Sequence, residues 1–248
     1  MKIFVFADGL FGLEVIKFLK KKKENLVGVA VHPKKYQNKG EEILQISKKI
    51  KTFQFGNNIS KNNLKKIKEL KPDIILVVFW RFLLKQELIK IPKYGAINFH
   101  MGYLPFNRGA NPNVWPILEN TPAGCSIHKI NKDIDSGYII AQKKVNHHLE
   151  DTAKDLYWRI FSNFLELFKK KWINIKKNKF RGKKIDISRG TIHYRKQFKN
   201  ISKINLRKKV YPIDLFNNIR AKMFEPHDLA YFFYKKKKYF VKIKIKQK

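Results

Sequence analysis

Two uninterrupted apolar runs constrain the fold of this chain more than any other feature. Lys2 to Ala7 and Asp73 to Phe79 are almost continuously hydrophobic and do not alternate, as in strands that are covered on both faces. The first run leads into Asp8-Gly9-Leu10-Phe11-Gly12 and then into apolar residues at helical spacing. A strand, a glycine turn and a helix start are typical of a nucleotide-binding α/β unit. The sequence therefore predicts a doubly wound, Rossmann-like α/β domain.

The rest of the chain continues this alternation and then changes character. Further strands are predicted at residues 26–31, 51–55, 94–99, 123–130 and 138–145, and helices at 41–47, 62–70, 85–89, 111–119 and from 151 onward. The composition shifts at 169–171, three lysines in a row, and again across 176–184, so we place a boundary near Asn178. We expect a main domain at 1–178 and a small C-terminal α+β module at 179–248. The module is predicted to hold a helix at 211–223 and a hairpin in which strands 229–234 and 239–245 are joined across four lysines.

Asn98, His100 and Asp135 are the candidates for chemistry. Asn98 and His100 are two apart at the end of the apolar strand, so both side chains leave the same face of the sheet. Asp135 lies in an Asp-Ser-Gly turn that can return a carboxylate to the histidine. An amide donor, a base and an orienting acid are what acyl transfer to an amine requires. Taken singly, each has a simpler explanation: a polar strand end, a hydrogen-bonded core histidine and a turn-forming aspartate.

These residues occur in order with a third motif between them. Asn-x-His (98–100), Leu-Pro-x-x-Arg-Gly (104–109) and Ile-Asp-x-Gly (134–137) together resemble the signature of the folate-dependent formyltransferases. The family includes methionyl-tRNA formyltransferase, glycinamide ribonucleotide transformylase and the sugar N-formyltransferases that act on nucleotide-linked amino sugars. The resemblance covers about residues 1–166. It departs from the family at residues 101–102, which are Met-Gly where the family commonly has Pro-Ser.

The resemblance implies a role for each candidate and makes 1–178 the catalytic domain. The formyl donor would be N10-formyltetrahydrofolate. His100 would take a proton from the attacking amine, Asp135 would orient and support the imidazole, and Asn98 would stabilise the oxyanion. Asp133, the other nearby carboxylate, is rejected for this role because Asp135 is the one that precedes Ser-Gly. The chain has no Cys/His cluster, so no metal is expected.

The same resemblance implies where the two substrates bind. The residues expected against the folate are Phe79, Trp80, Arg81, Phe82, Asn131, Lys132 and Asp133. The residues expected around the acceptor are Asp8, Gly9, Leu10, Phe11, Phe106, Asn107, Arg108, Gly109, Asn111, Tyr194 and Arg195. Simpler explanations stay open: the glycine turn as an ordinary βα turn, Trp80 and Phe82 as a cap on the core, and Tyr194 as packing between modules beside a solvated Arg195.

The net charge of +36 raises the question of nucleic acid. Only eight of the 55 basic residues are arginines, whereas base-reading proteins favour the bidentate arginine fork. Solvated lysine faces explain the composition better, and they attract anionic substrates. The single cysteine, Cys125, excludes an intrachain disulfide and is expected in a strand, and no apolar run has the length of a membrane span. We expect a cytoplasmic protein without a nucleic-acid partner, and a homodimer is left open.

The predicted function is formyl transfer to the amine of a nucleotide-linked amino dideoxy sugar, with dTDP as the expected nucleotide. Methionyl-tRNA formyltransferase is the first alternative; the tRNA enzymes of the family carry a full C-terminal β-barrel, whereas about 70 residues follow Asn178 here. A basic nucleic-acid-binding protein without catalysis is the second alternative, and the intact Asn98, His100 and Asp135 argue against it. The identity of the sugar and the position of its amine stay open.

Overall fold

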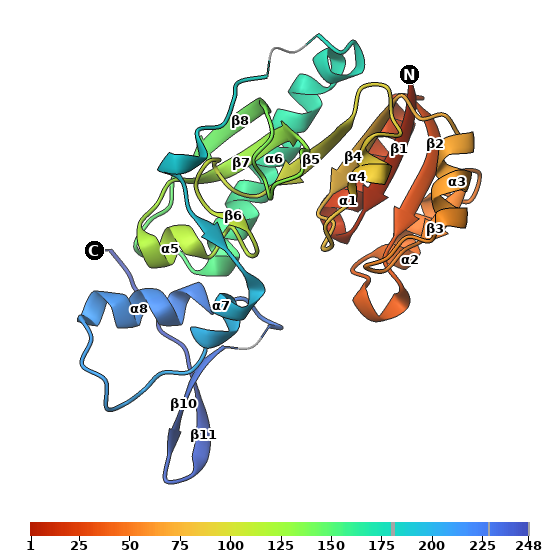
Figure 1. The fold of residues 1–248 in the computed structure, drawn as a ribbon. Coiled ribbons are helices and arrows are strands. Elements are labelled where there is room, and N and C mark those ends of the chain that lie inside the picture. The colour runs from red at the N-terminus through yellow and green to blue at the C-terminus, as the bar shows by residue number, and fades with distance from the viewer. Residues whose placement is uncertain (180–181, 228, 248) are drawn as a thin grey trace. The chain divides into compact units, whose positions relative to one another are not determined.

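A seven-stranded sheet in the order β3-β2-β1-β4-β5-β7-β8 organises the protein (Figure 1). The computed structural model describes residues 1–179, 182–227 and 229–247. The strands of the sheet are β1 (Lys2–Ala7), β2 (Asn25–Val31), β3 (Thr52–Gln54), β4 (Ile74–Val78), β5 (Ala96–His100), β7 (Ala123–Lys129) and β8 (Ile139–Val145). β1 to β5 pair in parallel and β7 runs antiparallel to β5. The predicted α/β class and the mostly parallel sheet are confirmed.

Helices connect these strands, and the contacts of the chain form two compact units. The helices are α1 (Gly9–Lys21), η1 (Lys34–Tyr36), α2 (Gly40–Ile46), α3 (Lys61–Glu69), α4 (Gln86–Ile89), α5 (Trp115–Glu119), α6 (Ala153–Lys176), η2 (Ile187–Arg189), α7 (Arg195–Asn200) and α8 (Pro212–Ala221). The first unit comprises residues 1–100, 126–141 and 165–185, and the second comprises 101–125, 142–164 and 186–248. The boundary that we place near Asn178 remains a prediction.

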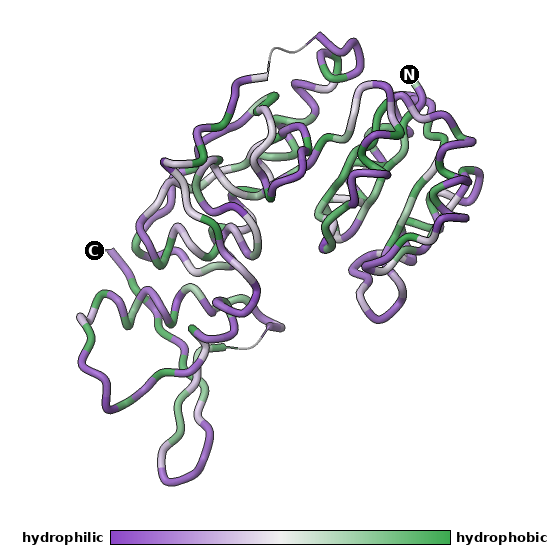
Figure 2. The backbone as a smooth tube through the Cα atoms, in the orientation of Figure 1, coloured by the Kyte–Doolittle hydropathy of each residue, from purple (hydrophilic) through white to green (hydrophobic). Residues whose placement is uncertain are grey.

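The core of the first unit explains the two continuous apolar runs. All five residues of β4 are buried, and β1 is buried from Ile3 to its end. Hydrophobic residues are concentrated along these central strands (Figure 2). On one face four rings contact one another at centroid distances of 5.2–6.0 Å, those of Phe4, Phe6, Phe53 and Phe55. Strands that are covered on both faces need no polar side, so their sequence does not alternate.

The second unit differs from the prediction in several segments. The helix predicted at 111–119 begins only at Trp115, and Asn111 has a left-handed φ of 54°, outside the helical region. No strand or helix is predicted between 179 and 210, but the structure has β9 (Ile192–His193) there, which pairs with β6 (Arg108–Gly109). The helix α7 follows from Arg195. Cys125 is buried in β7, as expected.

The C-terminal hairpin has a tighter turn than predicted. It consists of β10 (Ala230–Tyr234) and β11 (Lys237–Val241), so only Lys235 and Lys236 form the turn, both with positive φ. This is the geometry of a two-residue turn that matches the twist of the strands. The strand predicted at 239–245 therefore starts two residues earlier and ends at Val241. Among the described residues, no helix combines the length and apolar character needed to cross a bilayer.

Candidate active site

Strand β5 and its partner β7 bring polar side chains to one face of the sheet. Their antiparallel register places Asn98 opposite His128 and His100 opposite Ser126. Opposed residues in a sheet project to the same side, so all four side chains share one face. His100 is 5% exposed and His128 is 1% exposed. The end of β5 is thus a buried polar patch in a largely apolar sheet.

The loop between β7 and β8 carries Asp135 back to this patch. A hydrogen bond from the Lys129 N–H to the Tyr138 carbonyl, 2.9 Å long, closes the loop. Gly137 passes so near that a Cβ there would lie 1.7 Å from the Lys129 carbonyl oxygen, so no other residue fits. Asp135 itself has a φ of 45°, a left-handed conformation that aspartate tolerates better than most residues. The Asp-Ser-Gly sequence is therefore what this tight return requires.

Asp135 joins the residues that the sequence singled out. Its Oδ1 accepts a hydrogen bond from the Asn98 amide nitrogen at 2.9 Å, and its Oδ2 lies 3.4 Å from His100 Nδ1. The second contact is long for a hydrogen bond, and such contacts often tighten when a substrate binds. The Asp135 side chain is only 12% exposed, whereas Asp133 is exposed. The structure thus brings Asn98, His100 and Asp135 together.

His128 is a fourth member of this cluster that sequence reasoning missed. Its Nε2 lies 3.3 Å from Asp135 Oδ1 and 3.2 Å from Asn98 Nδ2, and its Nδ1 lies 2.9 Å from the Lys129 carbonyl. One signal was present in the sequence: Ser126 and His128 are polar at alternate positions of a strand whose other face is apolar. Only the register of β7 against β5 shows that this polar side faces Asn98.

The cluster supplies what acyl transfer to an amine requires. A buried carboxylate contacts one imidazole from each of two strands and one amide, so it can orient a base and stabilise its protonated form. The amide is a donor for charge that develops on an acyl oxygen. Among the described residues, no group of three or more His, Cys, Asp or Glu side chains is arranged to hold a metal ion.

The segment predicted to contact folate, residues 79–82, is braced by His32. The Trp80 ring stacks on the His32 ring at 3.6 Å, and the backbone N–H of Arg81 donates to His32 Nε2 at 3.3 Å. Phe82 meets His32 edge to face at 5.3 Å. Phe79 has a φ of 56°, and its ring stacks on Phe11 at 4.8 Å. His32 is fully buried, and its contacts with Trp80, Arg81 and Phe82 hold the segment in place.

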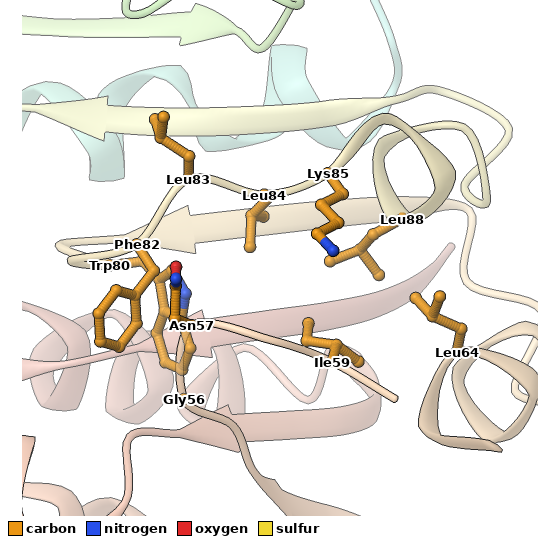
Figure 3. A pocket seen from close by; sticks show the side chains of 10 residues that line it. All are labelled: Gly56, Asn57, Ile59, Leu64, Trp80, Phe82, Leu83, Leu84, Lys85 and Leu88. Atoms are coloured by element: carbon orange, nitrogen blue, oxygen red, sulfur yellow. The ribbon is translucent and has the colours of Figure 1, made fainter. Parts of the chain in front are cut away.

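A pocket opens beside this segment (Figure 3). Its lining residues are Gly56, Asn57, Ile59, Leu64, Trp80, Phe82, Leu83, Leu84, Lys85 and Leu88. Trp80 and Phe82 lie at one end and Leu64 and Leu88 at the other (Figure 3). Two of the predicted folate residues therefore line it, and the side of the pocket formed by residues 56–64 was not anticipated. Asn131, Lys132 and Asp133 are exposed on the loop that carries Asp135.

The acceptor residues predicted in the first unit surround the start of α1. Burial raises the pKa of Asp8 to about 6, although hydrogen bonds from the Asn38 and Gly9 backbone and the nearby Arg81 charge oppose the rise. The Asn38 N–H donates to Asp8 Oδ1 at 2.9 Å, and the Gly9 N–H donates to the Asn38 carbonyl at 2.7 Å. Leu10 is half-buried. Phe11 is fully buried, so its ring offers no face to a nucleotide base in this structure.

The acceptor residues predicted in the second unit lie on β6, the loop around it and α7. Asn107 is fully buried, and its side-chain amide donates to Thr121 and to the Pro122 carbonyl, so it holds the loop together. Gly109 has a φ of 88° and packs directly on the His193 carbonyl. Phe106, Arg108 and Asn111 are half-buried in the same loop. Tyr194 is 56% exposed at the start of α7, and Arg195 is exposed beside it.

Comparison with known sequences gives matches along most of the chain. Residues 1–175 match the formyl transferase family, and residues 197–247 match the N-formyltransferase dimerization C-terminal domain. A methionyl-tRNA formyltransferase from Sulfurihydrogenibium sp. is 31% identical over 94% of this chain and 76% of its own length. The bifunctional polymyxin resistance protein ArnA of Wigglesworthia glossinidia brevipalpis is 32% identical over 72% of this chain. The chain spans 28% of the length of that protein and about half the length of several other methionyl-tRNA formyltransferases.

Comparison with solved structures extends over both units. A 4-N formyltransferase from Francisella tularensis has a TM-score of 0.84 and 28% identity, with 99% of this chain and 98% of that chain covered. An N-formyltransferase from Helicobacter canadensis, in complex with folinic acid and dTDP-3-aminofucose, has a TM-score of 0.71 and 25% identity, with 95% and 85% of the two chains covered.

Proposed function

Because this chain belongs to the formyl transferase family, we propose that it transfers a formyl group from N10-formyltetrahydrofolate to the amine of a nucleotide-linked amino sugar. The observation that carries the proposal is the contact of Asp135 with both His100 and Asn98 in a buried patch at the end of β5. No simpler explanation of the three residues taken singly accounts for this convergence. The resemblance seen in their motifs gives the same reaction.

Each residue of the cluster has one task in this reaction. The acceptor amine would add to the formyl carbon of the donor, and the bond between that carbon and N10 would then break. N10 of the leaving tetrahydrofolate would take up a proton, which the protonated His100 can supply. His100 has Nδ1 turned to Asp135, so Nε2 takes the proton from the attacking amine, and the Asp135 carboxylate stabilises the imidazolium that forms. Asn98 donates an N–H to the formyl oxygen as negative charge develops there. The low exposure of the cluster strengthens these electrostatic contacts relative to water.

The folate site of the proposal is the segment 79–82 with the adjoining pocket. A pterin is flat and partly polar, and it fits a pocket with aromatic side chains at one end, leucines at the other and Asn57 and Lys85 on its wall. The N-formyltransferase from Helicobacter canadensis binds folinic acid, which supports a folate donor. The donor would be held by residues 79–82 together with Asn131, Lys132 and Asp133. Its formyl group would reach His100.

The acceptor of the proposal is a sugar nucleotide, with dTDP as the expected nucleotide. The Francisella tularensis relative is a 4-N formyltransferase, and the Helicobacter canadensis relative binds dTDP-3-aminofucose. Charged initiator tRNA is the second candidate acceptor, because methionyl-tRNA formyltransferases are among the curated relatives. Coverage favours the sugar, because this chain matches 85% of the Helicobacter canadensis chain but about half the length of several methionyl-tRNA formyltransferases.

The acceptor contacts of the proposal come from both predicted groups of residues. In the first unit, the backbone N–H of Leu10 at the start of α1 would bind a phosphate. In the second unit, Arg195 is proposed separately as a phosphate ligand. Tyr194 would stack on the base, since Phe11 is buried. The buried Asn107 would act by holding the loop that carries Phe106, Arg108, Gly109 and Asn111. Asp8 would accept hydrogen bonds from the sugar.

A formylation assay tests the proposal. Purified protein is incubated with N10-formyltetrahydrofolate and, in separate reactions, a panel of dTDP- and UDP-linked 3-amino and 4-amino sugars or charged initiator methionyl-tRNA. We expect a mass increase of one formyl group on one nucleotide sugar and none on the tRNA. Formylation of the tRNA alone would establish the second candidate. Absence of any product, with tight and steeply salt-dependent RNA binding, would instead support the nucleic-acid protein.

A further inference from the structure

Positive charge is concentrated at the end of α6. Eight of the sixteen residues 169–184 are lysine and none is acidic, whereas the 47 lysines of the chain (55 basic residues less eight arginines) are spread over 248 residues. The last turn of a helix favours cations, because its carbonyl groups carry partial negative charge. This effect accounts for Lys176, but the lysines begin about two turns earlier, at Lys169. Stabilisation of the helix end therefore does not explain the cluster.

One face of this part of α6 combines lysines with an exposed apolar side chain. Ile173 is 51% exposed, whereas Trp172 and Ile175 are buried on the opposite side of the helix. The residues three and four positions from Ile173 lie beside it on the helix surface, and all four are lysines. They are Lys169, Lys170, Lys176 and Lys177, the last joined to the Ile173 carbonyl by a helical hydrogen bond of 3.0 Å. Lys176 is half-buried and the other three are exposed.

The end of α1 adds four lysines to this face. Residues 20–23 are all lysine and all exposed. Glu24, which follows them, accepts a hydrogen bond from the Trp172 indole N–H at 2.9 Å and lies 2.9 Å from Lys176 Nζ. These contacts, all within the first unit, place residues 20–23 beside the end of α6. We call residues 20–23, Ile173 and its four lysine neighbours the basic face. It carries eight lysines, of which the Glu24 carboxylate neutralises one.

We propose that the basic face docks the first unit on an anionic lipid surface, with its lysines at the headgroup phosphates and Ile173 at the boundary with the acyl chains. The attraction of a lysine to such a surface falls off within a Debye length of about 8–10 Å, so lysines act together only when they share one face. An exposed isoleucine gains free energy when it leaves water at the lipid boundary. This inference goes beyond the proposed function and does not depend on it.

Nucleic acid is the other anionic partner to consider, and the basic face fits it less well. Proteins that bind nucleic acid favour the arginine fork for phosphates and base edges, and they stack exposed aromatic side chains on bases. The basic face has no arginine and no aromatic residue. Its single exposed apolar side chain, Ile173, gains nothing from a phosphodiester backbone. Lipid is therefore the partner that accounts for both the lysines and the isoleucine.

Sedimentation of the full chain with vesicles tests the proposal. The vesicles contain phosphatidylcholine alone, or two parts phosphatidylcholine to one part anionic phosphatidylglycerol. We expect binding to the anionic vesicles only, at about 0.1 M salt, and its loss near 1 M, where the Debye length falls to about 3 Å. Replacement of residues 21, 22, 169 and 170 by Gln should lower the partition coefficient at least ~10-fold. Ile173→Gln leaves the charge unchanged and should lower it by roughly 3- to 10-fold.

A matched variant removes the same charge from α3. Residues 61, 65, 66 and 68 are exposed lysines, and their replacement by Gln should change the partition coefficient less than ~3-fold. An unchanged denaturation midpoint shows that each variant is folded. Equal losses from the two quadruple variants would overturn the inference, and so would wild-type binding without preference for anionic vesicles or full binding by Ile173→Gln. If an RNA oligonucleotide binds through residues 21, 22, 169 and 170 while vesicles do not bind, the face belongs to nucleic acid instead.

Discussion

At the scale of single residues, Asp8 shows how the site is built at some cost in stability. Burial raises its pKa from an ordinary 3.8 to about 6, so at neutral pH it is a charged group held where the neutral form is favoured. An acid whose pKa is raised by folding stabilises the folded protein fully when the pH is below its pKa in the unfolded chain. This stabilisation is lost as the pH rises through its pKa in the folded protein. The window of this effect for Asp8 is therefore about pH 4 to 6.

Replacement of Asp8 by Asn should remove this penalty. Asn can still accept the Asn38 N–H, but it does not ionise. We expect Asp8→Asn to raise the free energy of unfolding at pH 7.5 by about 1–2 kcal/mol, a value reduced for the part of the side chain that water reaches, and to have no effect near pH 4. Urea denaturation at the two pH values measures it, with the exposed Asp214→Asn as control. If Asp8→Asn is less stable than the wild type at pH 7.5, the positive charge of Arg81 fully compensates the burial of the Asp8 carboxylate.

Gly137 gives a prediction about loop closure. A methyl group there would overlap the Lys129 carbonyl, which is fixed in β7. Gly137→Ala should therefore displace Asp135 from His100, lower kcat by at least ~10²-fold and reduce the free energy of unfolding by ~1–3 kcal/mol. Steady-state kinetics and urea denaturation measure the two effects. Full activity in this variant would show that the loop has another way to present its carboxylate.

Some residues of the site could be predicted from the sequence more readily than others. Asn98 and His100 are two apart on one apolar strand, so local periodicity alone places them side by side. The choice of Asp135 over Asp133 needed the family motif, because two carboxylates in one turn cannot be ranked by spacing. His128 needed the register of β7 against β5, which is a non-local property. The burial of Phe11 and Asn107 likewise depends on packing across several elements.

At the scale of elements, Arg220 fastens α8 to the loop before α6. It is 5% exposed, its Nη1 donates to the His148 and Asp151 carbonyls at 3.0 and 2.9 Å, and its Nε donates to Asn217. Burial lowers its pKa. Asp151 is held in turn by a bidentate contact with Arg159. The charged group is thus fixed by hydrogen bonds in an otherwise buried position.

Arg220→Met should loosen this attachment. The apolar stem is kept, but two carbonyls lose their donor, that of Asp151 in a buried contact and that of His148 in a partly buried one. We expect the free energy of unfolding to fall by about 2–4 kcal/mol. The exposed Arg207→Met should change it by less than ~0.5 kcal/mol. Denaturation curves of the two variants give the comparison. Equal stability of Arg220→Met and the wild type would show that water replaces the guanidinium.

Elements were predictable where their signal was local. The buried strands and the amphipathic α6 follow from apolar runs and helical spacing. The pairing of β6 with β9 did not, because each strand has two residues and the pairing joins Arg108 to Ile192, far away in the sequence. The turn of the hairpin was placed too wide since four lysines in a row give no sign of which two adopt positive φ.

At the scale of the whole molecule, the hairpin β10–β11 supports the proposal of a homodimer. It is a separate two-stranded sheet with aromatic side chains on both faces, and Phe233, Tyr234 and Phe240 are 48–55% exposed. An isolated hairpin is only marginally stable in water, so a covering surface is expected. Residues 197–247 match a dimerization domain, which makes a second copy of this chain the proposed cover. A cytoplasmic location remains a prediction from the sequence.

Phe233→Lys combined with Phe240→Lys should convert a dimer into a monomer. The two residues lie on the same face of the hairpin with Tyr231, so both charges would enter the proposed contact. Light scattering after gel filtration measures the mass, and Lys236→Gln in the turn is the control. A wild-type monomer, or a dimer that survives both substitutions, would assign these aromatic side chains to another partner.

The central claim, that Asp135 with His100 and Asn98 performs formyl transfer, is tested most directly by the turnover number of Asp135→Asn. Asn tolerates the left-handed conformation at this position, so the backbone is kept while the charge is removed. With the nucleotide sugar identified by the assay, we expect kcat to fall by at least ~10²-fold, an equal fall for His100→Asn, and an unchanged denaturation midpoint. An Asp135→Asn enzyme that keeps half of the wild-type kcat would contradict the account.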